Sequence, residues 1–172
     1  MVYAGTHITQ SAQETAALGE KLGALVGSRA VVCLYGELGA GKTIFSQGFA
    51  RGVGITTRLL SPTFIIVRRY EIPHKESMLY HIDLYRTADM TDLATLGLEE
   101  IFTDPQAIVL IEWAQYIKDM LPAGRIDVEF SEVLDDTRTI TITQRRGGNR
   151  NPYKGRYRGV SHGYGIWYRV PD

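Results

Sequence analysis

Hydrophobic positions recur at helical spacing in the first part of the chain. Three leucines at spacings of four and three lie within residues 11–26, and this period predicts an amphipathic helix. Ser11 followed by Glu14 fits a capping box at the start of this helix. Gly27 is a plausible stop at its end.

Two short runs are apolar, apart from Glu112 near the end of the second, as expected for strands that are buried on both faces of a sheet: Val31–Tyr35 and Ile108–Trp113. A second helix is predicted from Lys42 to Arg51, with Gly52 and Gly54 ending it. Further strands are predicted at Phe64–Ile72, Met78–Asp83, Arg125–Phe130 and Thr137–Thr143, with helical turns at Thr87–Phe102 and before Leu121. Strands that alternate with helices indicate an α/β fold with a largely parallel, mixed sheet.

Composition agrees with one globular domain. The 172 residues are 44% hydrophobic and 22% charged, which disfavours full disorder, collagen and a membrane bundle. No apolar run approaches the ~20 residues that cross a bilayer, and the N-terminus does not resemble a secretory signal. Cys33 is the single cysteine, so neither an internal disulfide nor a cysteine zinc site is expected. These features predict a cytoplasmic protein that does not associate with membranes.

The net charge of zero hides a strong asymmetry between two parts of the chain. Residues 1–144 carry 12 Lys and Arg against 18 Asp and Glu, a net −6, whereas residues 145–172 carry 7 against 1, a net +6. We therefore expect an ordered domain over 1–144 and a flexible, basic C-terminal extension over 145–172. The extension interleaves Arg with Tyr, which would give weak, direct contact with nucleic acid. The alternatives are an extension without a role of its own, which the lack of a recognisable module favours, and one whose aromatic residues pack on the domain.

The strongest chemical signal follows the first apolar strand. The segment satisfies G-x-x-x-x-G-K-[ST] between a strand and a helix, which is the context that a phosphate-binding P-loop requires. It consists of Gly36, Glu37, Leu38, Gly39, Ala40, Gly41, Lys42 and Thr43. Its backbone N–H groups would hold phosphate oxygens, Lys42 would contact the β- and γ-phosphates, and Thr43 would bind Mg²⁺. This interpretation predicts a P-loop NTPase-like domain with three layers.

Two carboxylates end apolar strands and are candidates for positioning metal and water. Asp83 follows one predicted strand and Glu112 ends another, which is a Walker B arrangement with Glu in place of the usual Asp. A solvated carboxylate at a strand end is the alternative for each residue. His81 shares a sheet face with Asp83 and is interpreted as a hydrogen-bonded packing residue.

Several motifs in this order make the chain resemble the TsaE family, the bacterial ATPase component of tRNA threonylcarbamoyladenosine biosynthesis. Besides the P-loop, these motifs are Ser61-Pro62-Thr63-Phe64, Tyr80–Arg86 (YHIDLYR), Gly97-Leu98-Glu99-Glu100 and Ile111-Glu112-Trp113. The resemblance spans roughly residues 8–144. It implies ATP and Mg²⁺ as cofactors, and TsaD-like and TsaB-like proteins as partners that act on tRNA.

The resemblance also implies roles for individual residues. Asp83 and Glu112 match active-site acids, and Thr43 with Glu112 matches the metal site. The loop containing Ser61, Pro62 and Thr63 matches a switch-like region, and Trp113 a tryptophan beside the site. Arg138, on the last strand, resembles an arginine close to the nucleotide.

A small P-loop kinase acting on a metabolite or nucleotide is the competing interpretation. Such a kinase would carry several arginines in a lid, but Arg125 is the single arginine between Glu112 and Asp136. Arg68, Arg69 and Arg86 keep this alternative open.

Overall fold

The computed structural model describes residues 3–57, 59, 66–85, 96–134 and 136–147. The strands are β1 (Gly5–Thr9), β2 (Val31–Tyr35), β3 (Val67–Glu71), β4 (Met78–Asp83), β5 (Ala107–Glu112), β6 (Arg125–Leu134) and β7 (Thr137–Arg145). The helices are α1 (Ala12–Leu25), α2 (Lys42–Val53), α3 (Leu98–Thr103) and the 3-10 helix η3 (Ala114–Met120). None of the helices in the described ranges is long and apolar enough to cross a membrane.

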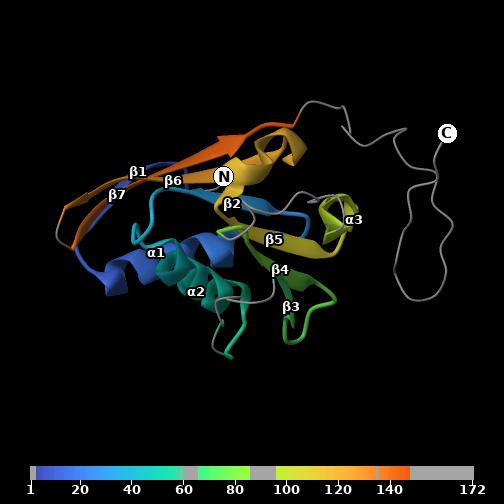
Figure 1. Cartoon of the computed structure of the whole chain (residues 1–172). Coiled ribbons are helices and arrows are strands. Elements are labelled where there is room, and N and C mark those ends of the chain that lie inside the picture. The colour runs from blue at the N-terminus through green and yellow to red at the C-terminus, as the bar shows by residue number, and fades with distance from the viewer. Residues whose placement is uncertain (1–2, 58, 60–65, 86–95, 135, 148–172) are drawn as a thin grey trace, which may run out of the picture.

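A seven-stranded sheet forms the centre of the domain, in the order β1-β7-β6-β2-β5-β4-β3 (Figure 1). The four strands β6, β2, β5 and β4 pair in parallel, and antiparallel pairs add β7 and β1 at one edge and β3 at the other. This topology confirms the predicted α/β fold with a mixed sheet. The carboxyl ends of β2, β4 and β5 meet at one edge, where ligands bind in open α/β sheets.

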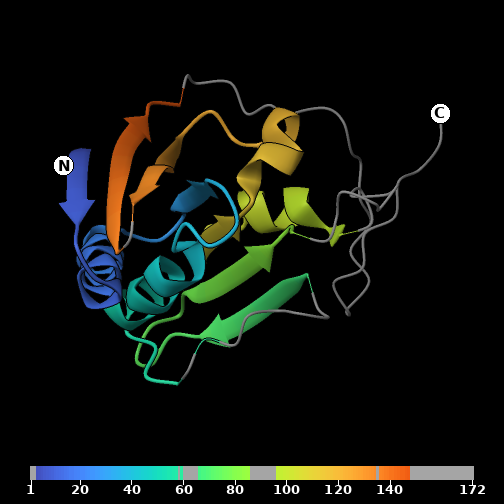
Figure 2. The same ribbon diagram turned by 60° about the vertical axis from the view of Figure 1, so that its left-hand side comes forward.

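Helices cover both faces of the sheet, which gives the three expected layers (Figures 1 and 2). Alternate residues of β2 enter the two cores, as the period of a strand requires. Val32 and Leu34 face α1 and α2, in a cluster that includes Phe45 and Phe49. Cys33 lies in the second cluster, with α3 and η3, and burial raises the pKa of its thiol to about 12.

The predicted elements agree with the structure except at some of their ends. Ser11 caps α1 by accepting a hydrogen bond from the Glu14 amide, but the helix ends at an extended Val26 and does not use Gly27 as its stop. Strand β7 continues to Arg145, beyond the expected Thr143. Strand β1 was not predicted, because its five residues carry little apolar periodicity.

Glycines determine how closely α1 and α2 approach each other. A Cβ on Gly19 would collide with the backbone carbonyl of Phe45, and one on Gly48 with that of Ala16. Gly52 does not end α2 as expected. It lies within the helix, against the carbonyl of Glu20, and a left-handed Gly54 ends the helix instead. The close packing holds α2, and therefore the P-loop at its start, against the rest of the domain.

Candidate functional site

The P-loop segment connects the end of β2 to the start of α2, as the sequence predicts. Gly36, Gly39 and Gly41 have φ values of 145°, 79° and 103°, a region that side-chain-bearing residues rarely occupy. No side chain caps α2 at Gly41. The loop therefore has the backbone conformation and the helix start that bind phosphate groups.

Lys42 is tied into the loop that precedes it. Its Nζ donates hydrogen bonds to the carbonyl oxygens of Gly36, at 2.7 Å, and Glu37, at 2.8 Å. The same nitrogen lies 3.8 Å from the ring centre of Trp113. Burial lowers the pKa of Lys42 below its usual value, although Glu112, Asp83 and Glu37 oppose that shift. The ammonium is thus positioned across the loop by hydrogen bonds to two of the loop's own carbonyl groups.

Glu112 ends β5 and contacts both the P-loop helix and β4. Its Oε2 accepts a 2.9 Å hydrogen bond from the Thr43 hydroxyl, and its Oε1 lies 3.0 Å from Nε2 of His81. Burial alone would raise the pKa of Glu112, but hydrogen bonding and charge from His81, then the hydroxyls of Ser46 and Thr43, bring it below the usual value. The buried carboxylate is therefore held as an anion, with one oxygen directed at Thr43, the residue that the sequence predicts to bind metal.

Asp83 lies at the end of β4, directly opposite Glu112 in the parallel register. Its Oδ1 accepts a 3.0 Å hydrogen bond from the Tyr85 amide. Asp83 is half-buried, whereas Glu112 is buried, so Asp83 is the more accessible acid. The two predicted acids thus lie side by side at the edge of the sheet that carries the P-loop.

Arg138 reaches the P-loop from β7, four strands from β4 in the sheet order. Its Nη1 donates to the Asp136 carbonyl at 2.7 Å, and its Nε would lie 2.9 Å from a Cβ placed on Gly41. That Nε is buried and has no hydrogen-bond partner among the described residues. A cation next to the start of α2 with an unused donor is suited to a phosphate oxygen.

Trp113 follows Glu112 in a left-handed conformation, with φ at 61°. Its ring packs against Tyr85, at 5.0 Å between centroids, and Tyr116, at 6.1 Å. The sequence predicted Trp113 at the site but not the two tyrosines, because an isolated aromatic residue carries no periodic signal. Leu38, in the P-loop, and both tyrosines are exposed, so an apolar rim borders Lys42.

Of the remaining candidates, the structure describes Arg68 and Arg69. Ser61, Pro62 and Thr63 lie outside the described residues, as does Arg86. Arg68 and Arg69 are in the edge strand β3, three strands from β2 and therefore about 14 Å across the sheet.

The donor atoms at the site suit Mg²⁺ better than they suit a metal ion that is coordinated by protein side chains alone. The described residues contain no group of three or more His, Cys, Asp and Glu side chains that could hold a metal ion. The Thr43 hydroxyl and the Glu112 carboxylate are hard oxygen donors, and Mg²⁺ usually combines such donors with substrate phosphates and water. These two residues, predicted as the metal site, therefore fit the ion.

Comparisons with known protein families, sequences and structures agree with one another. The family model described as "Threonylcarbamoyl adenosine biosynthesis protein TsaE" matches residues 9–140. The tRNA threonylcarbamoyladenosine biosynthesis protein TsaE of Bacillus subtilis is 41% identical to this chain, over 78% of this chain and 82% of the relative. The protein of the same name from Treponema pallidum is 36% identical, over 78% of this chain and 97% of the relative. The crystal structure of YdiB from Bacillus subtilis is similar with a TM-score of 0.68 and 36% identity, over 88% of this chain and 91% of YdiB.

Proposed function

This chain belongs to the TsaE family of threonylcarbamoyl adenosine biosynthesis proteins, and we propose that it binds and hydrolyses ATP with Mg²⁺ in the modification of tRNA. The observation that carries this proposal is the contact between Thr43 and Glu112 at the start of α2. It joins the P-loop to a strand-end carboxylate, and P-loop ATPases need both parts for metal-dependent hydrolysis.

The residues divide between binding and activation. Lys42, Arg138 and the glycine-rich backbone surround the start of α2 and bind the phosphates. Glu112, anchored by His81, orients Thr43 and its metal, while the accessible Asp83 positions the attacking water. When bound, Mg²⁺ supplies positive charge that neutralises the phosphate oxygens.

TsaD-like and TsaB-like proteins are the partners that we propose for this ATPase. The exposed side chains of Leu38, Tyr85 and Tyr116 border the site, and exposed aromatic residues are enriched where proteins dock. A partner seated on this rim would exclude water from the nucleotide and complete the catalytic surface. The isolated chain is therefore a slow ATPase, and its partners change the rate.

The test is steady-state ATP hydrolysis, measured for the protein alone and with purified TsaD-like and TsaB-like proteins. We expect slow basal turnover that changes several-fold on addition of the pair. The Tyr116→Ala variant should lose this response and keep its basal turnover, with the exposed Tyr3→Ala as a matched control. Phosphoryl transfer to a metabolite or nucleotide, in place of release of inorganic phosphate, would identify a kinase and overturn the proposal.

A further inference from the structure

A second concave site lies at the opposite end of the sheet from the P-loop. Its cavity, of about 530 Å³, includes Val31 at the start of β2, whereas the P-loop follows Tyr35 at the end of the same strand. The two sites are therefore about 16 Å apart along β2. No residue of the candidate ATP site contributes to the lining that the structure describes here.

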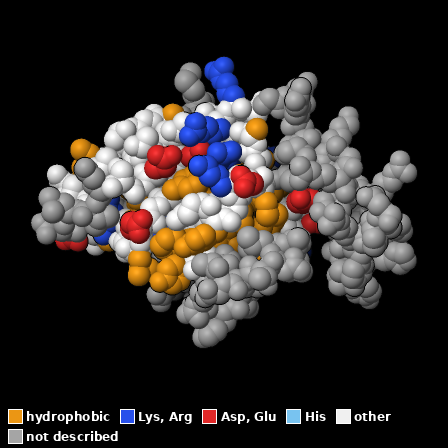
Figure 3. Space-filling model, turned by 45° about the horizontal axis from the view of Figure 1, so that its top comes forward, with side chains coloured by type: hydrophobic (Ala, Val, Ile, Leu, Met, Phe, Trp, Pro, Cys, Tyr) orange, Lys and Arg blue, Asp and Glu red, His pale blue; other side chains and the backbone are white. Residues whose placement is uncertain are grey.

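Four arginines line this cavity, and we call them the arginine pocket: Arg29, Arg125, Arg145 and Arg146. They come from the turn after α1, the start of β6 and the end of β7, so the fold gathers them from distant parts of the sequence. No acidic side chain is among the described residues that line the cavity. On the face that Figure 3 shows, a group of Lys and Arg side chains lies beside several Asp and Glu side chains.

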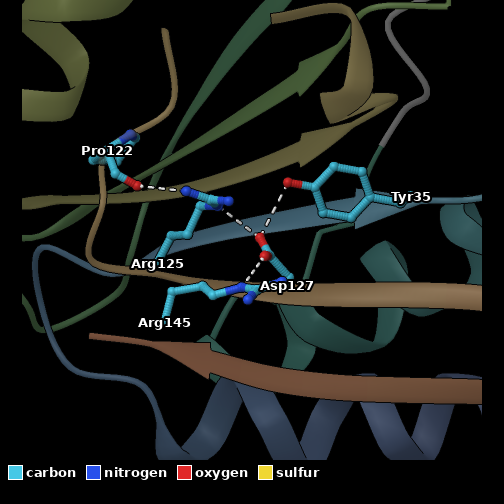
Figure 4. A network of polar contacts seen from close by, with 5 residues as sticks. All are labelled: Tyr35, Pro122, Arg125, Asp127 and Arg145. Carbon is cyan, nitrogen blue, oxygen red and sulfur yellow. Dashed lines mark hydrogen bonds and ion pairs between the residues drawn. The ribbon is translucent and has the colours of Figure 1, made fainter. Parts of the chain in front are cut away.

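Asp127, which lies under the pocket, fixes two of these arginines in place. It accepts hydrogen bonds from Nε of Arg125 at 2.7 Å and Nε of Arg145 at 2.8 Å, while the Tyr35 hydroxyl donates to it at 3.1 Å (Figure 4). Asp127 balances one of the four positive charges, which leaves the pocket with a net charge of about +3. Both contacts use Nε, so Asp127 leaves the terminal nitrogens of both arginines to other acceptors; Nη1 of Arg125 donates to the Pro122 carbonyl at 3.1 Å (Figure 4).

Arg145 and Arg146 are held at the pocket by the backbone as well. Gly147 and Gly124 approach so closely that a Cβ on Gly147 would lie 3.1 Å from the Gly124 nitrogen. The side chain of Arg145 is 52% exposed although its Nε is anchored. Arg29 has a left-handed backbone, with φ at 65°, and its amide donates to the Ala107 carbonyl at 2.8 Å. The side chains of Arg125 and Arg145 are thus positioned before any ligand binds, which reduces the entropy lost on binding.

The sequence beyond the pocket extends the same chemistry. Residues 147–172 carry five Lys and Arg and one acidic residue, with four tyrosines among them. A single phosphate would need only the pocket, whereas a chain of phosphates could contact the pocket and the cations that follow it. Cations interleaved with aromatic residues favour single-stranded or looped RNA over an acidic protein surface.

We propose that the arginine pocket binds the phosphate backbone of RNA, at a site separate from that for ATP. This inference rests on charge and geometry at the pocket and does not depend on ATP hydrolysis. The pocket positions the RNA relative to the domain, and the basic segment adds contacts that do not depend on base sequence.

The experiment measures binding of a fluorescently labelled tRNA to the full chain by anisotropy, between 25 and 200 mM salt (about 19 to 7 Å of screening length). The test variant is Arg29→Gln with Arg146→Gln, which removes two positive charges and leaves a shorter, neutral, polar side chain at each position. The matched control is Arg51→Gln with Arg69→Gln, two exposed arginines outside the pocket. Thermal unfolding checks that both variants are folded, and ATP binding checks that the P-loop is intact.

We expect the pocket variant to bind tRNA about tenfold more weakly at low salt, with a slope of log affinity against log salt that is smaller by about 1.4. The control should change affinity less than threefold. Equal losses in both variants would show that net charge alone attracts the RNA and would overturn the proposal. So would an absence of tRNA binding by the wild-type chain at 25 mM salt, or a pocket variant that binds tRNA normally but no longer binds an acidic partner protein.

Discussion

The hydroxyl of Thr43 and the carboxylate of Glu112 are joined by a 2.9 Å hydrogen bond, although 68 residues separate them in the sequence. The bond connects the first turn of α2 to the last residue of β5. Because Glu112 also contacts His81, three elements of the fold meet at the proposed metal site. The geometry of the proposed metal site therefore depends both on the assembly of the sheet and on the P-loop.

Neutralising either acid should separate hydrolysis from binding. We predict that Glu112→Gln and Asp83→Asn bind ATP with nearly normal affinity but lose turnover by about 100-fold or more, because metal positioning and water activation act mainly in the transition state. Calorimetry gives the affinity and phosphate release gives the turnover. Normal hydrolysis in both variants would show that these residues are ordinary strand-end carboxylates.

His81 should act through Glu112 and not on the nucleotide. His81→Leu leaves the buried carboxylate without its partner, so the Mg²⁺ concentration needed for half-maximal ATP binding should rise several-fold. ATP affinity measured in EDTA should stay unchanged. His81→Gln, which can still donate to Oε1, should restore much of the Mg²⁺ response. If the Leu and Gln variants had identical Mg²⁺ titrations, His81 would be a packing residue alone.

The packing of α1 on α2 should tolerate no added methyl group. We predict that Gly19→Ala lowers the free energy of unfolding by about 1–3 kcal/mol, because the new Cβ meets the Phe45 carbonyl. The control is Gly27→Ala, where nothing lies within 4 Å and no positive φ is required. Urea denaturation compares the two variants, and equal stabilities would contradict the helix contact described above.

Much of the fold and of the site follows from local signals in the sequence. The apolar run Val31–Tyr35 and the glycine pattern that follows it predict a strand and a P-loop, since each depends on neighbouring residues. Asp83 and Glu112 could be predicted because each ends a strand, and parallel strands bring their carboxyl ends together. The division into an acidic domain and a basic extension stays a prediction from charge, and β7 continues one residue past the expected boundary of the domain, to Arg145.

Features that depend on distant contacts could not be predicted. Strand β1 is held by pairing with β7, and its own five residues have weak strand character. Gly52 was interpreted as a helix stop because its contact with Glu20 on α1 is invisible in the local sequence. The arginine pocket escaped notice for the same reason, since Arg29 joins the others only when the sheet forms.

We predict that acidic pH lowers the free energy of unfolding of the domain by protonating Asp127. Burial raises the pKa of this carboxyl, but hydrogen bonds from Arg145 and Arg125 outweigh burial and hold it below the ordinary value of 3.8. The folded protein thus binds this proton less readily than the unfolded chain, so Asp127 contributes stability above the ordinary pKa and loses that contribution as pH falls through the lower, folded-state pKa.

The Asp127→Asn variant isolates this contribution. Its deficit in unfolding free energy, relative to wild type, should be greatest at neutral pH and should shrink as the pH falls below about 4. Urea unfolding from pH 7 to pH 3 measures the deficit. A deficit that is constant over this range would show that Asp127 stabilises the domain through packing and not through its charge.

The most direct measurement of the central claim is calorimetric titration of ATP with Mg²⁺ into the wild-type chain and into Lys42→Ala. Lys42 donates to two P-loop carbonyls and would contact the β- and γ-phosphates, so its removal should weaken ATP binding by at least about 100-fold. The control variant Lys118→Ala removes an exposed lysine and should bind ATP as wild type does. If Lys42→Ala bound ATP with wild-type affinity, or if the wild-type chain bound no ATP, the assignment of residues 36–43 as a working P-loop would be wrong.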